Sequence, residues 1–488
     1  MNVKQIKSIG GELKRFLAEF DDCFVRSESR QRLRDYIGGQ LSELPRKSVE
    51  PMALAAGILP RTLQCFLSSA QWDEHRMRDR IQWIVAREHQ HQQLIGTVDD
   101  TGHPKKGKHT AGVQRQWCGN TGKIDNCVVS VHIGCSDGDF QCLLDSDVFL
   151  PERWANDPER RKQAGIPDDV VFRKKTSIAL EQIRKAIGNG IRVSVWTFDE
   201  WYGRDGKFLD GLDVMGQSYV AEVPANFTGW VYEPRILQCP TPQEARKRGG
   251  KRRYPRLAKK ALPGSKVRNL LTYSRQFQEQ QWLQFKIKDG DKGPVVWEAK
   301  HMPFYRKQGP SGLPGPRHTL VVIRNILDPT EMKYFVCNMA VGPGGVSLKW
   351  ILWVAFSRWP IERCFELAKR DLGMDHFEAR GWHAIHRHLY ISQLSLLFCS
   401  NVHQHLREKN AGDSVPDRGA GSPRGQRLGL GPNVTLPSPE TDLPEDSRHD
   451  RLPSMPQPPI SHQPHKTNYS TPARNGYRSR SIEFVYTG

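Results

Sequence analysis

The sequence has 488 residues, with 72 lysines and arginines against 53 aspartates and glutamates, so its formal net charge is +19 and its pI is near 9.5. A bias of this sign favours polyanionic partners, nucleic acid first and an anionic membrane second. No apolar run approaches the roughly 18 residues needed to span a bilayer, and the charged N-terminus does not resemble a signal peptide. We therefore expect a soluble cytoplasmic protein. Its ten cysteines form no C-x-x-C pair, which predicts reduced, mostly buried thiols.

Residues 1–93 show apolar positions at three- and four-residue spacing and almost no strand alternation, which predicts a helical domain. Within it, VEPMALAAGILPRTLQCFLSSAQWD predicts a short helix, a break at Gly57 and a second helix that begins at Pro60. This is the pattern of a DNA-binding helix-turn-helix, whose second helix would expose Arg61, Thr62 and Gln64. Two packed helices of an ordinary bundle fit the pattern equally well.

Residues 94–216 change to an α/β pattern. LIGTVDD predicts a strand, and AGVQRQWC and DNCVVSVHIGC predict a hairpin around the turn GNTGK. Residues 172–188 predict an amphipathic helix, and IRVSVWTFD predicts the strand that follows it. This order is typical of a sheet whose central strands are buried on both faces.

Residues 217–317 are rich in aromatic and β-branched residues, Pro and Gly, which predicts a mainly β insertion. The basic run at 246–260, which includes Arg252 and Arg253, would contact DNA phosphates without sequence preference, or it is a surface loop that binds nothing specific. Trp230, Trp282 and Trp297 could stack on an unpaired base, but we expect at least two of them to be core residues.

Residues 318–409 return to regular elements. HTLVVIRNIL and MKYFVCNMAV predict strands, followed by one long helix from Leu348 to about Leu372 and another from His383 to about Glu408. Residues 410–488 are rich in Pro, Ser, Gly and Arg with few apolar residues, which predicts a disordered basic tail.

Asp99 and Asp199 each close a predicted strand, and strand ends of open α/β sheets are where ligand crevices form. Two aspartates on neighbouring strands would hold a hard divalent cation such as magnesium or manganese. Asp99 and Asp100 could instead form an ordinary turn before Thr-Gly. Alternation puts these two on opposite faces and does not tell which one faces the site.

Glu362 lies on a predicted helix, with Arg358 four residues before it and Lys369 seven residues after it, close to one face. Such a charged stripe is usually solvated. Here the surrounding WILWVAFSRWPIERCF is apolar enough to be largely buried, and buried charges need partners or a metal.

Three segments together resemble a known family: VDDTG followed by PKKGKH, then FDEWYG, then RWPIERCFELAKRDLGMDHFEAR. The chain resembles insertion-sequence DDE transposases, in the subgroup with the signature Tyr-x2-Arg-x3-Glu-x6-Lys, over about residues 15–405. The resemblance implies an RNase H-like mixed sheet with flanking helices, formed by residues 94–216 and 318–409 and interrupted by the β insertion.

The resemblance also implies roles for individual residues. Asp99, Asp199 and Glu362 would be the catalytic acids and the ligands of two Mg²⁺ or Mn²⁺ ions. Asp99 is preferred to Asp100 because the first acid of the family tends to read Asp-x-Thr. Arg358 and Lys369 would contact DNA phosphate near the cut. The tyrosine of the signature falls on Ala355, and Trp353, Phe356 or Trp359 would have to replace it.

The implied activity is cutting of double-stranded DNA at the element ends and joining of those ends to target DNA by two-metal phosphoryl transfer, with a homodimer in the synaptic complex. Two alternatives remain. One is a DNA-binding remnant that occupies element ends without catalysis, and the other is an RNase H-like nuclease that does not join strands.

Overall fold

The computed structural model describes residues 3–89, 93–239, 254–290, 293–309 and 311–413. Residues 1–415 fall in one compact unit. Arg252, Arg253 and all of the predicted tail beyond residue 413 lie outside the described residues. No helix in these described ranges is long and apolar enough to cross a membrane.

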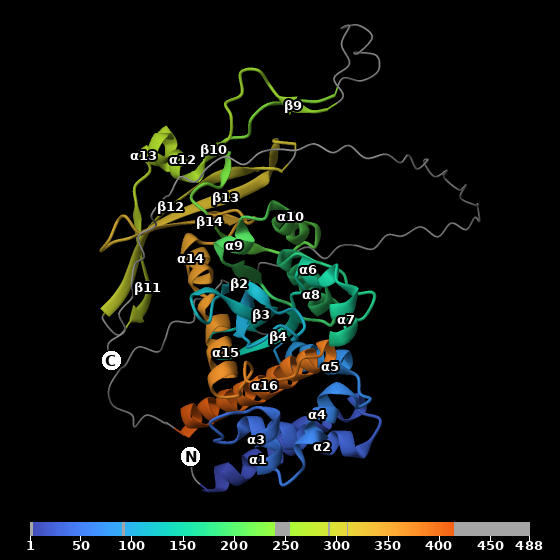
Figure 1. Cartoon of the computed structure of the whole chain (residues 1–488). Helices are drawn as coiled ribbons and strands as arrows, with labels where there is room; N and C mark the ends of the chain where they lie inside the picture. The colour runs from blue at the N-terminus through green and yellow to red at the C-terminus, as the bar shows by residue number, and fades with distance from the viewer. Residues whose placement is uncertain (1–2, 90–92, 240–253, 291–292, 310, 414–488) are drawn as a thin grey trace, which may run out of the picture. The chain divides into compact units, whose positions relative to one another are not determined.

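The N-terminal region is helical, as predicted, and further helices flank the strands (Figure 1). The helices of the first 89 residues are α1 (Val3–Ala18), a 3-10 turn (Asp21–Cys23), α2 (Ser27–Leu41), α3 (Val49–Ala55), α4 (Pro60–Ser68) and α5 (Glu74–Glu88). Those between the strands are α6 (Glu152–Ala155), α7 (Pro158–Ala164), α8 (Lys175–Gly188), α9 (Glu200–Gly203), α10 (Gly206–Val214), α12 (Val267–Tyr273) and α13 (Arg275–Glu279). The last three are α14 (Leu348–Phe356), α15 (Trp359–Arg370) and α16 (Trp382–Asp413).

Twelve strands form one mixed sheet, and two short strands pair separately. The first half of the sheet contains β1 (Ile95–Pro104), β2 (Gln114–Cys118), β3 (Lys123–Ser136), β4 (Gln141–Val148), β5 (Val195–Phe198) and β6 (Tyr219–Val223). The second half contains β7 (Thr228–Trp230), β10 (Ser265–Lys266), β11 (Leu283–Gly290), β12 (Gly293–Lys307), β13 (Pro314–Asn325) and β14 (Met332–Cys337). The separate pair is β8 (Ile236–Leu237) with β9 (Arg256–Leu257).

The predicted fold class, a mixed α/β sheet with flanking helices, is confirmed. β1 pairs antiparallel with β3 and parallel with β5, and β5 pairs parallel with β6. The predicted hairpin is also present, since β2 pairs antiparallel with β3. Beyond β6 the sheet continues through β14, β13 and β12. β6 (Tyr219–Val223), which the sequence placed in the insertion, is thus a central strand, because its buried apolar residues pair with β5 on one side and β14 on the other.

Helices cover both faces of the central strands. On one face, α14 packs on the side chains of Ile95, Val195 and Val220, and α15 packs further along β1 and β3. On the other face, α8 and α10 cover Val98 and Trp196. The cysteines of this region are free, as predicted, and are mostly buried.

The helix predicted from Leu348 to Leu372 is two helices, and the prediction of one continuous helix was wrong. α14 ends at Phe356 and α15 begins at Trp359. The break has a simple cause: Pro360 lacks the backbone N–H that would donate to the carbonyl four residues earlier. It leaves Arg358 at the start of α15, within 3.4 Å of Asp99 on β1.

The N-terminal helices share a core with the rest of the unit. α16 contacts α2, α4 and α5 on one side and β4 on the other, and Figure 1 shows it between the blue N-terminal helices and the sheet. Phe20, Ile37 and Phe66 belong to the same buried cluster as Leu394 and Leu397 of α16. Residues 1–93 therefore rely on α16 for much of their burial.

Two of the three tryptophans of the predicted insertion are core residues, as expected. Trp230 and Trp297 are 2% and 5% exposed. Trp282 is partly buried, with the guanidinium of Arg324 4.2 Å from the centre of its ring.

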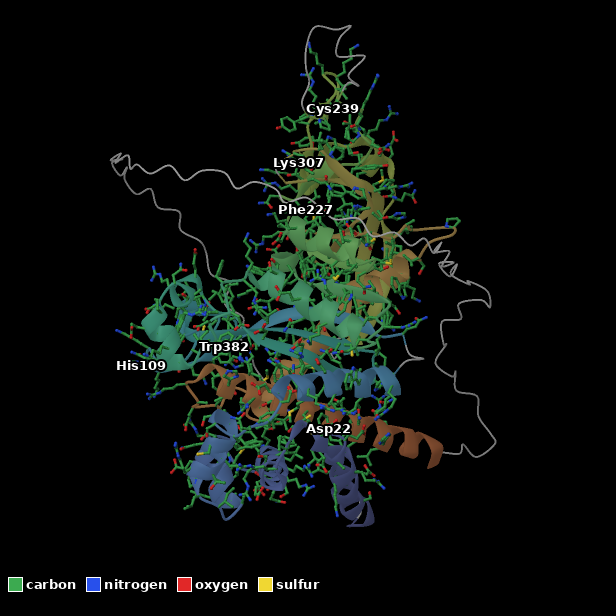
Figure 2. All side chains as sticks on the ribbon, turned by 90° about the vertical axis from the view of Figure 1, so that its right-hand side faces the viewer. Asp22, His109, Phe227, Cys239, Lys307 and Trp382 are labelled. Carbon is green, nitrogen blue, oxygen red and sulfur yellow. The ribbon has the colours of Figure 1, made fainter. Side chains whose placement is uncertain are left out.

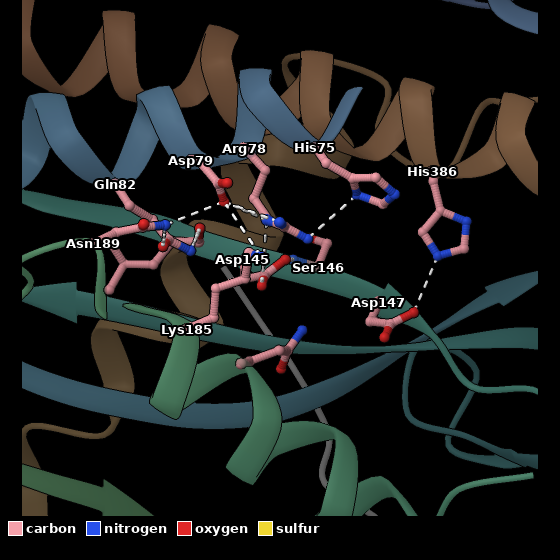
Figure 3. Close-up of polar contacts among 12 residues, drawn as sticks. His75, Arg78, Asp79, Gln82, Asp145, Ser146, Asp147, Lys185, Asn189 and His386 are labelled. Atoms are coloured by element: carbon pink, nitrogen blue, oxygen red, sulfur yellow. Dashed lines mark hydrogen bonds and ion pairs between the residues drawn. The ribbon is translucent and has the colours of Figure 1, made fainter. Parts of the chain in front are cut away.

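Buried polar contacts also hold α5 against the sheet (Figure 3). Arg78 of α5 bonds Asp79 at 2.9 Å and lies 4.0 Å from Asp145 of β4. Burial raises the pKa of Asp145 to about 6, although Arg78 opposes the shift. Asp147 differs: burial would raise its pKa, but the hydrogen bond with His386 at 3.1 Å and the ion pair with Arg173 at 2.8 Å together outweigh burial and lower the pKa to about 2.

A buried ion pair between Arg387 of α16 and Glu74 of α5 completes this junction. Both side chains are 9% exposed, and the guanidinium also donates to the carbonyls of Leu67, Ala70 and Trp72. Removing one partner of such a pair leaves an uncompensated buried charge, which costs about 3–5 kcal/mol.

We predict that Arg387→Ala lowers the free energy of unfolding by about 3 kcal/mol in urea denaturation. Arg407→Ala is the matched control on the same helix. The ion pair of Arg407 with Asp139 is 58% and 66% exposed, and exposed pairs contribute about 1 kcal/mol or less. Equal effects of the two substitutions would contradict a structural role for the Arg387 contacts.

Candidate active site

Asp99 and Asp199 follow the last paired residues of two parallel strands. Val98 of β1 lies opposite Phe198 of β5, so the next residue on each strand is one of the two aspartates. β5 ends there, but β1 continues to Pro104 in antiparallel pairing with β3. Asp99 is thus inside a strand and not at its end, a correction to the sequence interpretation. It still lies at the point where β1 loses its parallel neighbour, because the chain leaves the sheet after β5.

Arg358 connects Asp99 with Glu362. Its guanidinium lies 3.4 Å from Oδ2 of Asp99 and 2.7 Å from Oε1 of Glu362. The charge of Asp199 also acts on Arg358, and these acids raise its pKa against the effect of burial. Arg358 thus contacts two of the three acids that the sequence selected, Asp99 and Glu362, and the third acts on it through its charge.

The surroundings of Asp99 disfavour the ionised form of its carboxyl group. Its side chain is 18% exposed, and Oδ1 accepts a hydrogen bond from the backbone N–H of Asp100. Burial first, and then repulsion by Asp199, raise its pKa to about 8, while Arg358 opposes the shift. A positive charge placed beside Asp99 and Asp199 would relieve this repulsion.

Asp100 has a different partner on the other face of β1. Both of its carboxylate oxygens accept from Nζ of Lys175 in α8, at 3.0 and 3.1 Å. Burial raises the pKa of Asp100, and Lys175 opposes the shift. Because neighbouring strand residues point to opposite faces, Asp99 shares a face with Arg358 while Asp100 is neutralised by α8.

Lys175 and Tyr202 lie beside the acids and were not predicted from the sequence. The Tyr202 hydroxyl is buried among Asp99, Asp100 and Asp199: burial raises its pKa well above the usual value, and the three carboxylates raise it further. Tyr202 lies in the FDEWYG segment, which was a usable signal. Lys175 had no such signal, since an N-terminal lysine of an amphipathic helix is usually solvated.

Asp199 also has a local structural role. It is the N-cap of α9, and its Oδ1 accepts from the backbone N–H groups of Trp201 and Tyr202 at 3.0 and 3.2 Å. The other end of this short helix is pressed onto β6. A Cβ on Gly203 would lie 1.9 Å from the carbonyl oxygen of Glu222, so only glycine fits there. The cap uses one oxygen of Asp199 and leaves Oδ2 for other contacts.

The charged stripe of α15 is less buried than its apolar surroundings predicted. Glu362 has a 40% exposed side chain, and Trp353 and Trp359 are 41% and 59% exposed. Lys369 bends back onto β1, where Nζ donates to Oγ1 of Thr101 at 2.6 Å and to the carbonyl of Gly102 at 3.3 Å. The charged stripe of Arg358, Glu362 and Lys369 thus faces β1, and its N-terminal end is exposed to solvent.

The donor set suits a hard divalent cation, since carboxylate oxygens are the ligands that Mg²⁺ and Mn²⁺ prefer. Asp99 and Asp199 repel each other as carboxylates, and a bound cation would offset this repulsion. Among the described residues, however, no three His, Cys, Asp or Glu side chains are gathered as a ready-made metal site. Arg358 contacts both Asp99 and Glu362, so these carboxylates already have a cationic partner.

Carboxylates at adjoining strands, beside an arginine and on a basic protein, define a class of site suited to metal-assisted chemistry on phosphates. Sequence comparison agrees. The model of the DDE superfamily endonucleases matches residues 19–294, more than half of the sequence, and the chain belongs to this family. The family resemblance drawn from the motifs is confirmed, and the subgroup signature stays a prediction.

One curated relative is the "Probable transposase for insertion sequence element IS701" of Microchaete diplosiphon, which is 31% identical over 191 residues. The match covers 38% of this chain and 47% of the relative, so the chain spans about half the length of that protein. Among solved structures, a piggyBac transposase synaptic complex with hairpin DNA matches with 9% identity and a TM-score of 0.34. That match covers 82% of this chain and 78% of the other.

The raised pKa of Asp99 gives a prediction for the metal-free protein. An unfolded carboxyl group ionises near pH 4, whereas folded Asp99 ionises near pH 8. Stability that depends on neutral Asp99 is therefore present at low pH and is lost as the pH rises from about 4 to about 8.

We expect Asp99→Asn to be more stable than the parent protein above pH 8 in EDTA, by about 2 kcal/mol, and the difference to vanish near pH 4. Denaturation at a series of pH values measures it. A constant difference between pH 4 and pH 8 would show that ionisation of Asp99 is not the cause.

Proposed function

We propose that this protein is an insertion-sequence transposase that cuts DNA at the element ends and joins those ends to target DNA. Asp99, Asp199 and Glu362 are its catalytic acids. The observation that carries the proposal is the meeting of Asp99 of β1 and Glu362 of α15 at Arg358, with Asp199 at the end of the neighbouring strand β5. Family membership and the net charge of +19 support it.

Divalent ions, Mg²⁺ or Mn²⁺ and two in number, would when bound activate the attacking oxygen and stabilise the leaving oxygen in an in-line displacement. Asp99, Asp199 and Glu362 would hold them. Asp99 is the better candidate than Asp100, because Lys175 already neutralises Asp100 on the opposite face.

The remaining residues of the site position DNA and the acids. Arg358, 26% exposed and beside the acids, is placed to bind the phosphate next to the cut. Lys369 holds β1 through Thr101 in the DNA-free protein, and on the same helix face it would add a second phosphate contact. No protein nucleophile is needed, because water attack cuts the end and attack by the new 3′-hydroxyl joins it.

The partners follow from this activity: double-stranded DNA at the element ends and in the target, and a second copy of the chain to bring two ends together. A remnant that binds ends without cutting is the alternative from another class. The intact set of three acids favours the enzyme over the remnant. A nuclease that does not join strands is separated from the transposase by the products alone.

Asp199→Asn tests the catalytic acid while retaining the cap, since an amide oxygen can still accept the two backbone hydrogen bonds. We expect it to bind end-containing DNA like the parent and to cut it at least roughly 100-fold more slowly in Mg²⁺. The control is Asp205→Asn. Asp205 caps α10 in the same way but contacts none of the other acids.

Gel analysis of cut and joined products gives the readout. Equal cutting by Asp199→Asn and Asp205→Asn would remove Asp199 from the catalytic set. A parent protein that binds its ends but never cuts them would support the remnant, and cutting without joined products would support the nuclease.

Recognition of the element ends is assigned to α4, which follows the turn at Gly57 as the helix-turn-helix pattern predicts. Arg61 and Gln64 are exposed on this helix. Surface substitution is a better test than deletion of residues 1–93, because deletion would expose the core face of α16.

We predict that Arg61→Ala with Gln64→Ala reduces the preference for end DNA over random DNA about tenfold and leaves binding to random DNA almost unchanged. Competition binding measures the ratio. Arg34→Ala, an exposed arginine of α2, is the control, and a retained preference in the double variant would exclude α4 as the reading helix.

A further inference from the structure

The PKKGKH segment, which follows the first acid, forms one rim of a basic groove remote from the three acids. The groove has a volume of about 820 Å³. Its charged lining consists of Lys108 from this segment, Arg115 from β2, and Arg153 and Arg160 from α6 and α7. Its lining contains no acidic side chain.

The four cations of the groove are not neutralised by any acidic side chain that the structure describes. Within the described residues, none of the four forms a salt bridge, whereas Arg78, Arg173 and Arg306 each pair with acids. Acids next to the groove residues in sequence do not line the groove. Glu152 and Glu159, which adjoin Arg153 and Arg160, are not among its lining residues. Asp125 adjoins the groove residue Asn126 on β3, but alternation turns it to the opposite face of the strand.

The groove is built from ordered parts. Nδ2 of Asn126 donates to the carbonyls of Lys105 and Gly107, which fixes the turn that carries Lys108. Arg160 donates to the carbonyl of Lys108 and stacks 3.7 Å from the ring centre of Trp154, which forms the floor. Figure 2 shows the neighbouring His109 at the outer edge of the fold. The turn that carries Lys108 and the guanidinium of Arg160 are thus held by contacts within the fold.

The groove lies on the same face of the sheet as Asp99. Asp99 is opposite His132 on β3, and the backbone N–H of Lys105 donates to Asn126 six residues along that strand. Because side chains alternate along a strand, residues six positions apart point to the same face, and six residues span about 20 Å. That distance equals about six base pairs of B-form DNA. Lys369, over Thr101, lies between the two places.

An apolar pair extends the groove toward the tip of the β2–β3 hairpin. Trp117 and Ile124 are paired across the two strands and are 64% and 60% exposed. Trp117 is two residues from Arg115 and therefore on the same face. Exposed apolar side chains beside arginines are a combination that DNA-binding surfaces use against sugars and base edges.

We propose that this groove binds the backbone of duplex DNA about six base pairs from the cut and keeps the DNA aligned with the three acids. Lys108, Arg115 and Arg153 contact phosphates, and Trp117 contacts the sugars or bases beside them. The inference rests on the proposed function for the identity of the DNA. Its test does not need cutting, so the two can fail separately.

The experiment measures binding of the full chain to a 40-base-pair duplex of arbitrary sequence in EDTA, as a function of salt. The variants are Arg115→Gln with Arg153→Gln, both exposed positions. The charge-matched control is Arg184→Gln with Arg192→Gln, also exposed and located at and after α8. Thermal denaturation confirms that both double variants are folded.

We expect the groove variant to lower affinity at least tenfold at 0.1 M salt and to reduce the slope of log K against log salt by about two, one unit per lost phosphate contact. The control should change neither by more than about twofold. Trp117→Ala should lower affinity without changing the slope, because it removes no charge.

Two outcomes would overturn the proposal. Equal losses in the groove variant and the control would show a general effect of net charge. An unchanged duplex affinity, with a loss only on a 40-nucleotide single strand, would assign the groove to single-stranded DNA. If the parent cannot cut DNA but the groove variant shows the expected change in slope, the transposase proposal fails and the groove stands.

Discussion

The pairing of Arg358 with Asp99 and Glu362 is the interaction on which the candidate site depends. It places an acid of a helix beside an acid of a strand, although 263 residues separate them in the chain. Clustered carboxylates repel one another, and in the metal-free protein a guanidinium is the group that offsets this repulsion. Under the proposed function, the same cation would also bind a DNA phosphate, so DNA and the acids would compete for Arg358.

The two faces of β1 carry acids with different partners at this point. Asp99 faces α15 and the open end of the charged stripe, while Asp100 faces α8 and is neutralised by Lys175. A one-residue slip of β1 would exchange the two carboxylates. The register is held by pairing of β1 with β3 over its whole length and with β5 up to Val98. This pairing explains why two adjacent acids have different partners.

α16 joins the regions that the sequence divides into domains. It packs against the N-terminal helices on one side and β4 on the other, and Arg387 ties it to α5. α4 contacts α16, and α16 contacts β4, so the N-terminal helices are connected through α16 to the sheet that carries the acids. The groove beside α6 and α7 is lined by residues of β2 and β3 in the same sheet.

Several features followed from the sequence alone. Periodicity predicted the N-terminal helices, the β2–β3 hairpin and α8, because local apolar patterns depend on which face of an element is buried. The structure brings Asp99 and Glu362 to one arginine and places Asp199 at the end of the neighbouring strand, and the catalytic roles of these acids remain proposals. Pro360 is the sequence signal for the break between α14 and α15, because proline lacks the backbone N–H donor that a continuous helix needs.

Other features were decided only by the tertiary structure. β6 joins the central sheet through partners from distant segments, and the ion pair that distinguishes Asp100 from Asp99 comes from Lys175, 75 residues away. The basic groove combines a turn, a strand and two short helices whose cations are scattered in the sequence. Sequence determines which residues are charged and which elements form locally. Which charges meet depends on strand register and helix packing, because these are long-range contacts that no local pattern encodes.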